Sequence, residues 1–310
     1  MRLEFIAKGS EEASGGSKEE KAGLKILSGD QLKELQQIQL MILDDIIAIC
    51  RRYQISYMLI AGSALGALRG GEFIPWDDDI DIAMPRREFE KFVRVVRKHW
   101  SDKYSVIHPQ DPDNEGRLIP KLRLKGTEYR TFLEWDLKES GIFIDIFTFE
   151  NIPDNALLRK IHGILCNGFG FALSVRRLYR GRKHYVKIYN SPSFYAKCAL
   201  GALLSFASIE KWTQWTDFWY SACRNTKTRD VSCPTDTFHY FGEIYERAGI
   251  EETYEVPFSG RMCAVSRDVD GYLRHRYGDY MQVPPESGRM RNWYLTYDPG
   301  IYGKKERADV

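Results

Sequence analysis

The chain has 310 residues, of which 43% are hydrophobic and 13% aromatic, so it can bury one large core or one core that carries a substantial insertion. Its 45 Lys and Arg nearly balance its 43 Asp and Glu, which removes the strong positive field typical of nucleic-acid binders, and we expect no nucleic-acid partner. The six cysteines are scattered without CxxC spacing, which disfavours a disulfide framework or a zinc site and favours buried thiols in a reducing cytoplasm.

The first 24 residues and the most apolar run of the chain bear on targeting. Residues 1–24 begin with a short charged stretch and continue with Gly, Ser and Glu, which predicts a loosely packed tail and no secretory signal. The longest nearly uncharged apolar run, residues 198–209, is too short for a membrane-spanning helix, which needs roughly 20 residues. We therefore expect no membrane span.

Helical and strand patterns alternate in the first part of the chain. Apolar residues recur at steps of three and four over residues 30–50, which predicts an amphipathic helix capped by Ser28 and Gln31. A short apolar strand at 57–61 is then predicted to end in a glycine–serine turn.

This turn, Gly62 and Ser63, leads into a brief helix that ends near Arg69. Polar and apolar residues alternate from Asp79 onward, as in a half-buried strand. Pro85 follows and is expected as the first residue of the next helix, because proline suits that position.

Strands dominate the next stretch, and helices dominate the one after it. We predict a strand at 104–107, a hairpin at 117–132 that turns at Lys125 and Gly126, and a buried strand at 142–147. Helical runs rich in aromatic and Arg residues follow to about residue 225.

These elements predict an α/β (α+β) protein with a mixed-sheet core and a helical insertion. The boundaries we predict are a tail at 1–24, a catalytic core at 25–153, a helical subdomain at 154–250 and a C-terminal segment at 251–310 that completes the domain.

Two acids, Asp79 and Asp81, are the strongest candidates for metal binding. Residues i and i+2 of a strand project from the same face, so both carboxylates can reach one point. Their mutual repulsion is relieved by a cation, and hard oxygen ligands suit Mg²⁺ or Mn²⁺. The alternative is a solvated acidic turn, but the apolar residues that alternate with the acids, Ile80 and Ile82, favour a packed strand.

The Gly62–Ser63 turn is a candidate phosphate-binding element. Glycine permits a close approach of the backbone, and the amides and dipole at the start of the next helix favour an anion. Asp145 is the third candidate acid, because it stands alone in the apolar run 142–147 and its burial requires a partner. That partner is either a metal shared with Asp79 and Asp81 or a buried Arg or Lys.

Three blocks of the chain resemble the LicD family of phosphocholine and polyol-phosphate transferases, of the nucleotidyltransferase-fold superfamily: residues 57–92, 141–153 and 272–285. The resemblance implies transfer of a phosphorylated alcohol from a CDP-activated donor to a hydroxyl of a cell-surface glycan, free or lipid-linked. It also implies that Asp79, Asp81 and Asp145 hold the metal.

Several other residues are candidates for substrate contacts. Arg69, Lys121 and Arg123 could hold donor phosphates, with a solvated surface as the alternative for each. Asp77 and Asp78 could orient substrate or metal-bound water, or could act as caps of the turn.

Two longer segments have candidate binding roles. The basic run 176–187 together with 198–209 could contact a membrane surface peripherally, at the inner face of the membrane, or form a solvated helix face. Tyr277 to Tyr280 could line the mouth of the site, or pack as ordinary aromatics.

Three functional hypotheses follow. The first is phospho-alcohol transfer, in which Asp145 is a candidate base that metal coordination would weaken. The second keeps the fold but transfers a nucleoside monophosphate and releases pyrophosphate. The third is a non-catalytic ligand-binding scaffold, which the intact acids disfavour.

Overall fold

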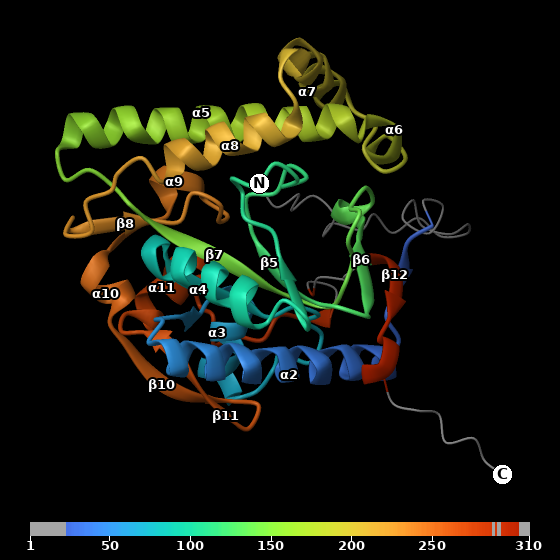
Figure 1. The fold of residues 1–310 in the computed structure, drawn as a ribbon, viewed down its shortest axis with the longest axis vertical. Coiled ribbons are helices and arrows are strands. Elements are labelled where there is room, and N and C mark those ends of the chain that lie inside the picture. Colours follow the sequence, from blue (N-terminus) through green and yellow to red (C-terminus); the bar gives the residue numbers. More distant parts are fainter. Residues whose placement is uncertain (1–22, 287–288, 290–292, 304–310) are drawn as a thin grey trace.

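The computed structural model describes residues 23–286, 289 and 293–303. A central mixed sheet lies between a helical layer on one side and helix α2 on the other (Figure 1). The predicted α/β class is therefore confirmed. Residues 1–22 of the predicted tail lie outside the described residues, whereas Leu24 is buried in a small apolar cluster with Phe132 and Tyr185.

The helices differ greatly in length, and the longest have 25 residues. In chain order they are α2 (Gly29–Tyr53), α3 (Ala61–Gly70), α4 (Arg86–His99), α5 (Ala156–Arg180), α6 (Arg182–Tyr185), α7 (Pro192–Leu203), α8 (Ile209–Tyr220), α9 (His239–Gly242), α10 (Arg247–Glu251) and α11 (Val269–Tyr277). Short 3-10 turns occupy Phe132–Glu134, Leu204–Phe206 and Gly300–Tyr302.

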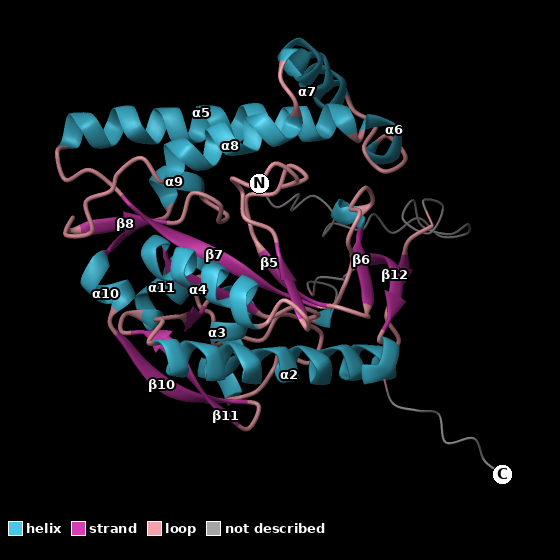
Figure 2. Cartoon of the chain, viewed as in Figure 1, coloured by secondary structure: helices cyan, strands magenta, loops and turns pink. Residues whose placement is uncertain are grey.

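The strands of the central sheet are drawn in magenta among those of Figure 2, and they comprise one parallel pair with antiparallel neighbours. Its strands, in spatial order, are β2 (Met58–Leu59), β3 (Asp81–Pro85), β7 (Phe143–Asn151), β5 (Lys121–Leu124) and β4 (Tyr104–Val106), and β8 (Asp230–Ser232) and β9 (Ile244–Glu246) extend it from the end of β7. Only β3 and β7 run parallel among these pairs.

Two smaller sheets complete the described strands. They consist of β1 (Lys25–Ile26), β12 (Trp293–Asp298) and β6 (Glu128–Thr131), in that order, and of the hairpin β10 (Thr253–Phe258) and β11 (Arg261–Ser266).

The predicted hairpin at 117–132 is wrong, although both of its strands exist. Strand β5 uses one edge for β4 and the other for β7, so neither edge is left for β6, which pairs with β12 instead. The turn still lies at Lys125 and Gly126, where Gly126 has a φ of 78°. The Thr127 hydroxyl then donates to the Leu124 carbonyl oxygen and accepts from the Ile142 amide, which directs the chain away from β5.

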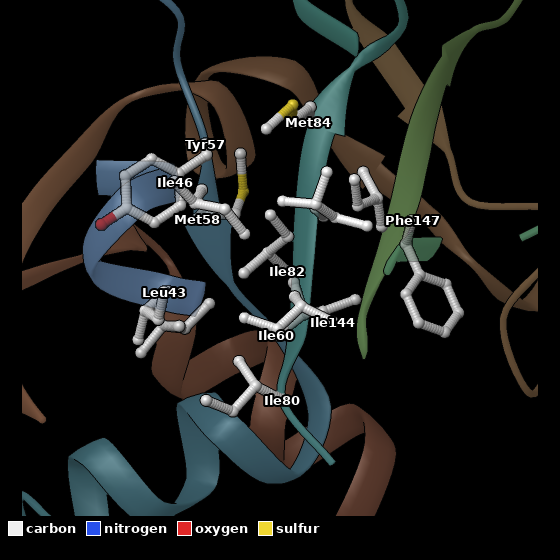
Figure 3. Packing of buried hydrophobic residues seen from close by; sticks show 14 of the residues in the cluster. Leu43, Ile46, Tyr57, Met58, Ile60, Ile80, Ile82, Met84, Ile144 and Phe147 are labelled. Atoms are coloured by element: carbon white, nitrogen blue, oxygen red, sulfur yellow. The ribbon is translucent and has the colours of Figure 1, made fainter. Parts of the chain in front are cut away.

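Helix α2 forms as its apolar periodicity predicts. Its start carries the predicted capping box, in which the Ser28 hydroxyl accepts from the Gln31 amide and the Gln31 side chain accepts from the Ser28 amide. Its buried face contacts the sheet through Leu43 and Ile46, which Figure 3 shows beside Met58 and Ile82. This packing supports the strands that carry the acidic residues.

A buried ion cluster joins the helical layer to the sheet. Arg86, the first residue of α4, donates through Nε to Glu150 on β7 at 3.0 Å and through Nη2 to Asp217 on α8 at 2.8 Å. All three side chains are largely buried. Pro85, expected as the first residue of α4, is the residue before it and ends β3.

The helical layer contains α5, α7 and α8, and the last two pack against α5. Within the described part of the chain, no single helix is long and apolar enough to cross a membrane, but the bent pair Pro192–Phe206 and Ile209–Tyr220 passes that test of length and composition together. All six cysteines are free thiols, as expected, and Cys223 is the one that is only half-buried.

Candidate active site

Three acids from two neighbouring strands converge at one end of the central sheet. Asp81 is the first residue of β3, Asp145 is the third residue of β7, and the parallel register places them opposite each other. One oxygen from each of these carboxylates and one from Asp79 lie within 4.8 Å of one another. The structure thus brings together the three acids that the sequence grouped. Asp79 lies just before β3 and not within it, so the strand begins two residues later than predicted.

Burial raises the free-energy cost of keeping the three carboxylates of this cluster ionised. Asp81 and Asp145 are buried, and Asp79 is half-buried. Burial raises the pKa of Asp145, the charge of Lys121 opposes that rise, and the charge of Asp79 adds to it. Three carboxylates at this separation therefore need positive charge nearby.

Lys121 supplies one such charge. Its Nζ lies 2.6 Å from Oδ1 of Asp145 and 3.7 Å from Oε1 of Glu134. The antiparallel register of β5 and β7 places Lys121 directly opposite Asp145, and its ammonium also lies 3.3 Å from the centroid of the Phe143 ring. The sequence offered a metal or a buried basic residue as the partner of Asp145, and the structure shows a basic residue beside it, the half-buried Lys121.

Arg123 belongs to the structural support of this site. It is buried, and its Nη2 lies 2.6 Å from Oε1 of Glu134, a residue that sequence reasoning missed. Burial alone would raise the pKa of Glu134, but the charges of Arg123 and Lys121 outweigh it and hold the value at about 2. Glu134 therefore stays ionised and fixes both basic side chains next to β7.

The turn predicted at Gly62 and Ser63 lies one residue earlier. Helix α3 begins at Ala61, which has a φ of 47°, so Gly62 and Ser63 form its first turn. The buried Ser63 hydroxyl accepts a 2.9 Å hydrogen bond from the Asp81 amide, and this bond ties the start of α3 to the acidic strand. A Cβ on Gly62 would overlap the carboxylate of Asp77, so any other residue here would displace that side chain.

The other predicted substrate residues are divided between the site and its periphery. Asp78 is buried and accepts from the Tyr129 hydroxyl, and its carbonyl oxygen accepts from Gln39 at 2.7 Å. Asp77, Asp78 and Asp79 form a second group of acids with converging oxygens. Arg69 donates to the carbonyl oxygens of Tyr280 and Gln282, which places it in a contact with the C-terminal segment.

The C-terminal segment also supports the start of α3. The Ala61 amide donates to the Tyr272 hydroxyl at 3.2 Å, and that hydroxyl lies 3.5 Å from the buried carboxylate of Asp236. Arg276 in turn pairs with Asp236 at 2.5 Å. The contact between Ala61 and Tyr272 joins residues 211 positions apart, and no local pattern in the sequence signals it.

The chemistry of the donor set fits a divalent cation. Carboxylate oxygens are the ligands that Mg²⁺ and Mn²⁺ prefer, and Asp79, Asp81 and Asp145 offer one each within a small volume. These residues would hold the ion, with Lys121 and the first turn of α3 beside it.

Comparison with known proteins agrees with this arrangement. A model of the family described as LicD/FKTN/FKRP, nucleotidyltransferase domain, matches residues 54–162, which include all three acids. The chain is also 28% identical over 277 residues to the lipopolysaccharide cholinephosphotransferase LicD of Haemophilus influenzae, an alignment that covers 82% of this chain and 93% of that protein. These matches show that the chain is similar to the LicD/FKTN/FKRP nucleotidyltransferase domain over the part that carries the acidic cluster on β3 and β7, and to a LicD cholinephosphotransferase over most of its length.

Proposed function

We propose that this protein transfers a phosphorylated alcohol, phosphocholine or a polyol phosphate, from a CDP-activated donor to a hydroxyl of a cell-surface glycan. The observation that carries the proposal is the convergence of Asp79, Asp81 and Asp145 beside the first turn of α3. The name of the Haemophilus relative, a cholinephosphotransferase that acts on lipopolysaccharide, supports both a phospho-alcohol and a glycan acceptor.

The acids and their neighbours have separate tasks in this reaction. Asp79, Asp81 and Asp145 would hold Mg²⁺ or Mn²⁺, which when bound neutralises the negative charge of a diphosphate. Lys121 holds Asp145 in place at 2.6 Å and adds positive charge at the same end of the sheet. Ser63 fixes the position of Asp81 through its amide.

The proposed transfer forms one phosphorus–oxygen bond and breaks another. The acceptor hydroxyl oxygen attacks the phosphorus that carries the alcohol, the bond from that phosphorus to the CMP oxygen breaks, and CMP leaves with the bond electrons. The hydroxyl proton is released as the new phosphodiester forms. The protein contributes mainly by orienting the two reactants and by placing fixed charges around them.

Product analysis with labelled CDP-choline and an acceptor glycan tests this proposal. We expect release of CMP, labelled glycan, dependence on Mg²⁺ or Mn²⁺, and loss of transfer in Asp81→Ala. Asp102→Ala is the matched control, because Asp102 is an exposed acid in the turn between α4 and β4. Thermal-shift measurements with CDP-choline, CDP-ribitol and CDP-glycerol identify the preferred donor, since a bound ligand raises the melting temperature.

The family description names a nucleotidyltransferase domain, which makes nucleotidyl transfer the second candidate. In that reaction CTP or another nucleoside triphosphate is consumed and pyrophosphate is released. The second candidate is supported if the protein releases pyrophosphate from a nucleoside triphosphate and releases no CMP from any CDP-alcohol. A binding scaffold is indicated if the parent protein shows no turnover and Asp81→Ala binds glycan or nucleotide as tightly as the parent does.

A further inference from the structure

The outer face of α5 exposes a stripe of large apolar side chains. Leu157, Ile161, Ile164 and Phe171 are between 47% and 67% exposed. Their spacings of three, four and seven residues place them on one face of the helix. A helix whose apolar residues served only the core would not present them along a surface of this length.

A second apolar group lies on the neighbouring helix α7 and the turn that follows it. Leu203 is 76% exposed and Phe206 is 74% exposed, and Tyr195 at the start of α7 is also exposed. Helix α7 packs against α5, so both groups belong to the same helical layer (Figure 1). The layer therefore presents apolar side chains at several places on its surface.

The charge of this layer differs sharply from that of the rest of the chain. Residues 155–229 contain thirteen Lys and Arg but only two Asp and Glu, a net charge of +11, whereas the whole chain has +2 and the remainder therefore −9. Both acids are engaged: Asp217 is buried against Arg86, and Glu210 lies 3.6 Å from Arg180. Exposed cations include Lys160, near the start of α5, and Lys183, in α6.

We propose that the helical layer docks on a membrane surface that contains anionic lipids. Exposed apolar side chains next to a high density of Lys and Arg are the features that bind the interface of such a membrane. A second copy of the chain is disfavoured as the occupant, because two copies of a segment with this excess of Lys and Arg would repel each other, although Arg159, Arg180 and Arg229 pair with acids outside it. The proposal does not depend on the reaction, and it adds the stripe on α5 to the segment 176–209 that the sequence indicated.

Docking of this layer would also orient the acidic site. Strand β7 carries Asp145 near its start and leads within a few residues into α5. The ion cluster of Arg86, Glu150 and Asp217 fastens the same strand to α8. A membrane-bound layer would therefore hold the site at a fixed position relative to the lipid surface.

Co-sedimentation with vesicles tests the proposal on the full chain. We expect binding to vesicles of phosphatidylcholine mixed with phosphatidylglycerol, weaker binding to phosphatidylcholine alone, and release as the salt concentration rises. Two double variants should each bind the anionic vesicles at least about tenfold more weakly than the parent protein. One combines Leu203→Ser with Phe206→Ser, and the other combines Lys183→Glu with Lys187→Glu.

Matched controls separate a local effect from a general loss of hydrophobicity or charge. Ile301→Ser removes a side chain that is 88% exposed in the 3-10 turn Gly300–Tyr302, and Lys98→Glu reverses an exposed charge at the end of α4. Both should bind vesicles like the parent protein, and circular dichroism should show all variants folded. The proposal is overturned if the parent protein does not bind anionic vesicles, or if the helical-layer variants bind them as tightly as the parent protein. It is equally overturned if sedimentation analysis shows that Leu203→Ser with Phe206→Ser instead abolishes a self-association, because the face would then join two copies.

Discussion

The amide of Asp81 donates a 2.9 Å hydrogen bond to the hydroxyl of Ser63, and this bond fixes the acidic strand against the first turn of α3. Both residues are buried, so water cannot replace either partner. The bond links the two parts of the chain from which the sequence predicted metal and phosphate binding.

Ser63→Ala should therefore lower both stability and activity. The change leaves the Asp81 amide buried without its acceptor, at a cost of about 1–3 kcal/mol in the free energy of unfolding. Urea denaturation measures this cost, and the transfer assay should show a fall in kcat. Ser193→Ala is the control, because Ser193 is exposed at the start of α7, and it should change neither quantity measurably.

Gly62→Ala should disturb the same corner by a steric route. The added methyl group would overlap the Asp77 carboxylate and displace it, and we expect a loss of at most about 1–3 kcal/mol in stability, the range for overpacked sites. Gly70→Ala in the same helix has open space around its Cβ and should be neutral or slightly stabilising. Truncating the neighbour as well, in Gly62→Ala with Asp77→Ala, should recover most of the stability. Failure of that double variant to recover would show that the clash is not the cause.

Lys121→Met should separate metal binding from catalysis. The ammonium lies 2.6 Å from Asp145 and repels a divalent cation bound there, so the variant should bind Mn²⁺ more tightly in a calorimetric titration. Its kcat should nevertheless fall, because a positive charge beside the reacting phosphates is lost. Lys121→Arg should retain part of the activity, and Lys125→Met, in the exposed turn after β5, should behave like the parent. Weaker Mn²⁺ binding in Lys121→Met would contradict this account.

Arg86→Met should destabilise the protein in a way that depends on pH. The change leaves Glu150 and Asp217 buried without their cation, at a cost of about 3–5 kcal/mol near neutral pH. Burial already raises the pKa of Glu150 and Arg86 opposes this, so the variant raises it further. A folded-state pKa above the unfolded one means that stability is lost as pH rises through it.

The cost of Arg86→Met should accordingly be larger at pH 8 than at pH 5, which chemical denaturation at the two values measures. Arg51→Met provides the comparison, since Arg51 and Glu255 form an exposed pair that contributes less than about 1 kcal/mol. An equal loss at both pH values would mean that Glu150 does not titrate in this range.

Local patterns predicted the elements and the acids that lie near each other in the chain. The periodicity of α2 and its capping box depend on neighbouring residues, and the structure has both. The alternation after Asp79 located strand β3, but that strand is buried on both faces and not half-buried as predicted. Asp145 was identifiable because one carboxylate in an apolar strand is costly to bury. Its place beside Asp81 follows once β3 and β7 are paired.

Which strands pair with each other could not be predicted from such local patterns. The two strands of the predicted hairpin were located correctly, but alternation does not say which edge of a strand is already occupied. For the same reason, Lys121 was recognised as a candidate without its partner Asp145, and Glu134 was missed altogether. Tyr272 and Asp236 support the start of α3 from the far end of the chain, where only the folded structure reveals them.

The small sheet of β1, β6 and β12 has a consequence for the order of assembly during translation. Its middle strand, β12, is the last of the three to be synthesised, so β1 and β6 lack their partner strand until residues 293–298 have left the ribosome. The Tyr129 hydroxyl on β6 donates to Asp78, and its ring lies 6.5 Å from the ring of Tyr294 on β12, centroid to centroid. A nascent chain that already contains every acid of the site would therefore still lack the contact between Tyr129 and Tyr294.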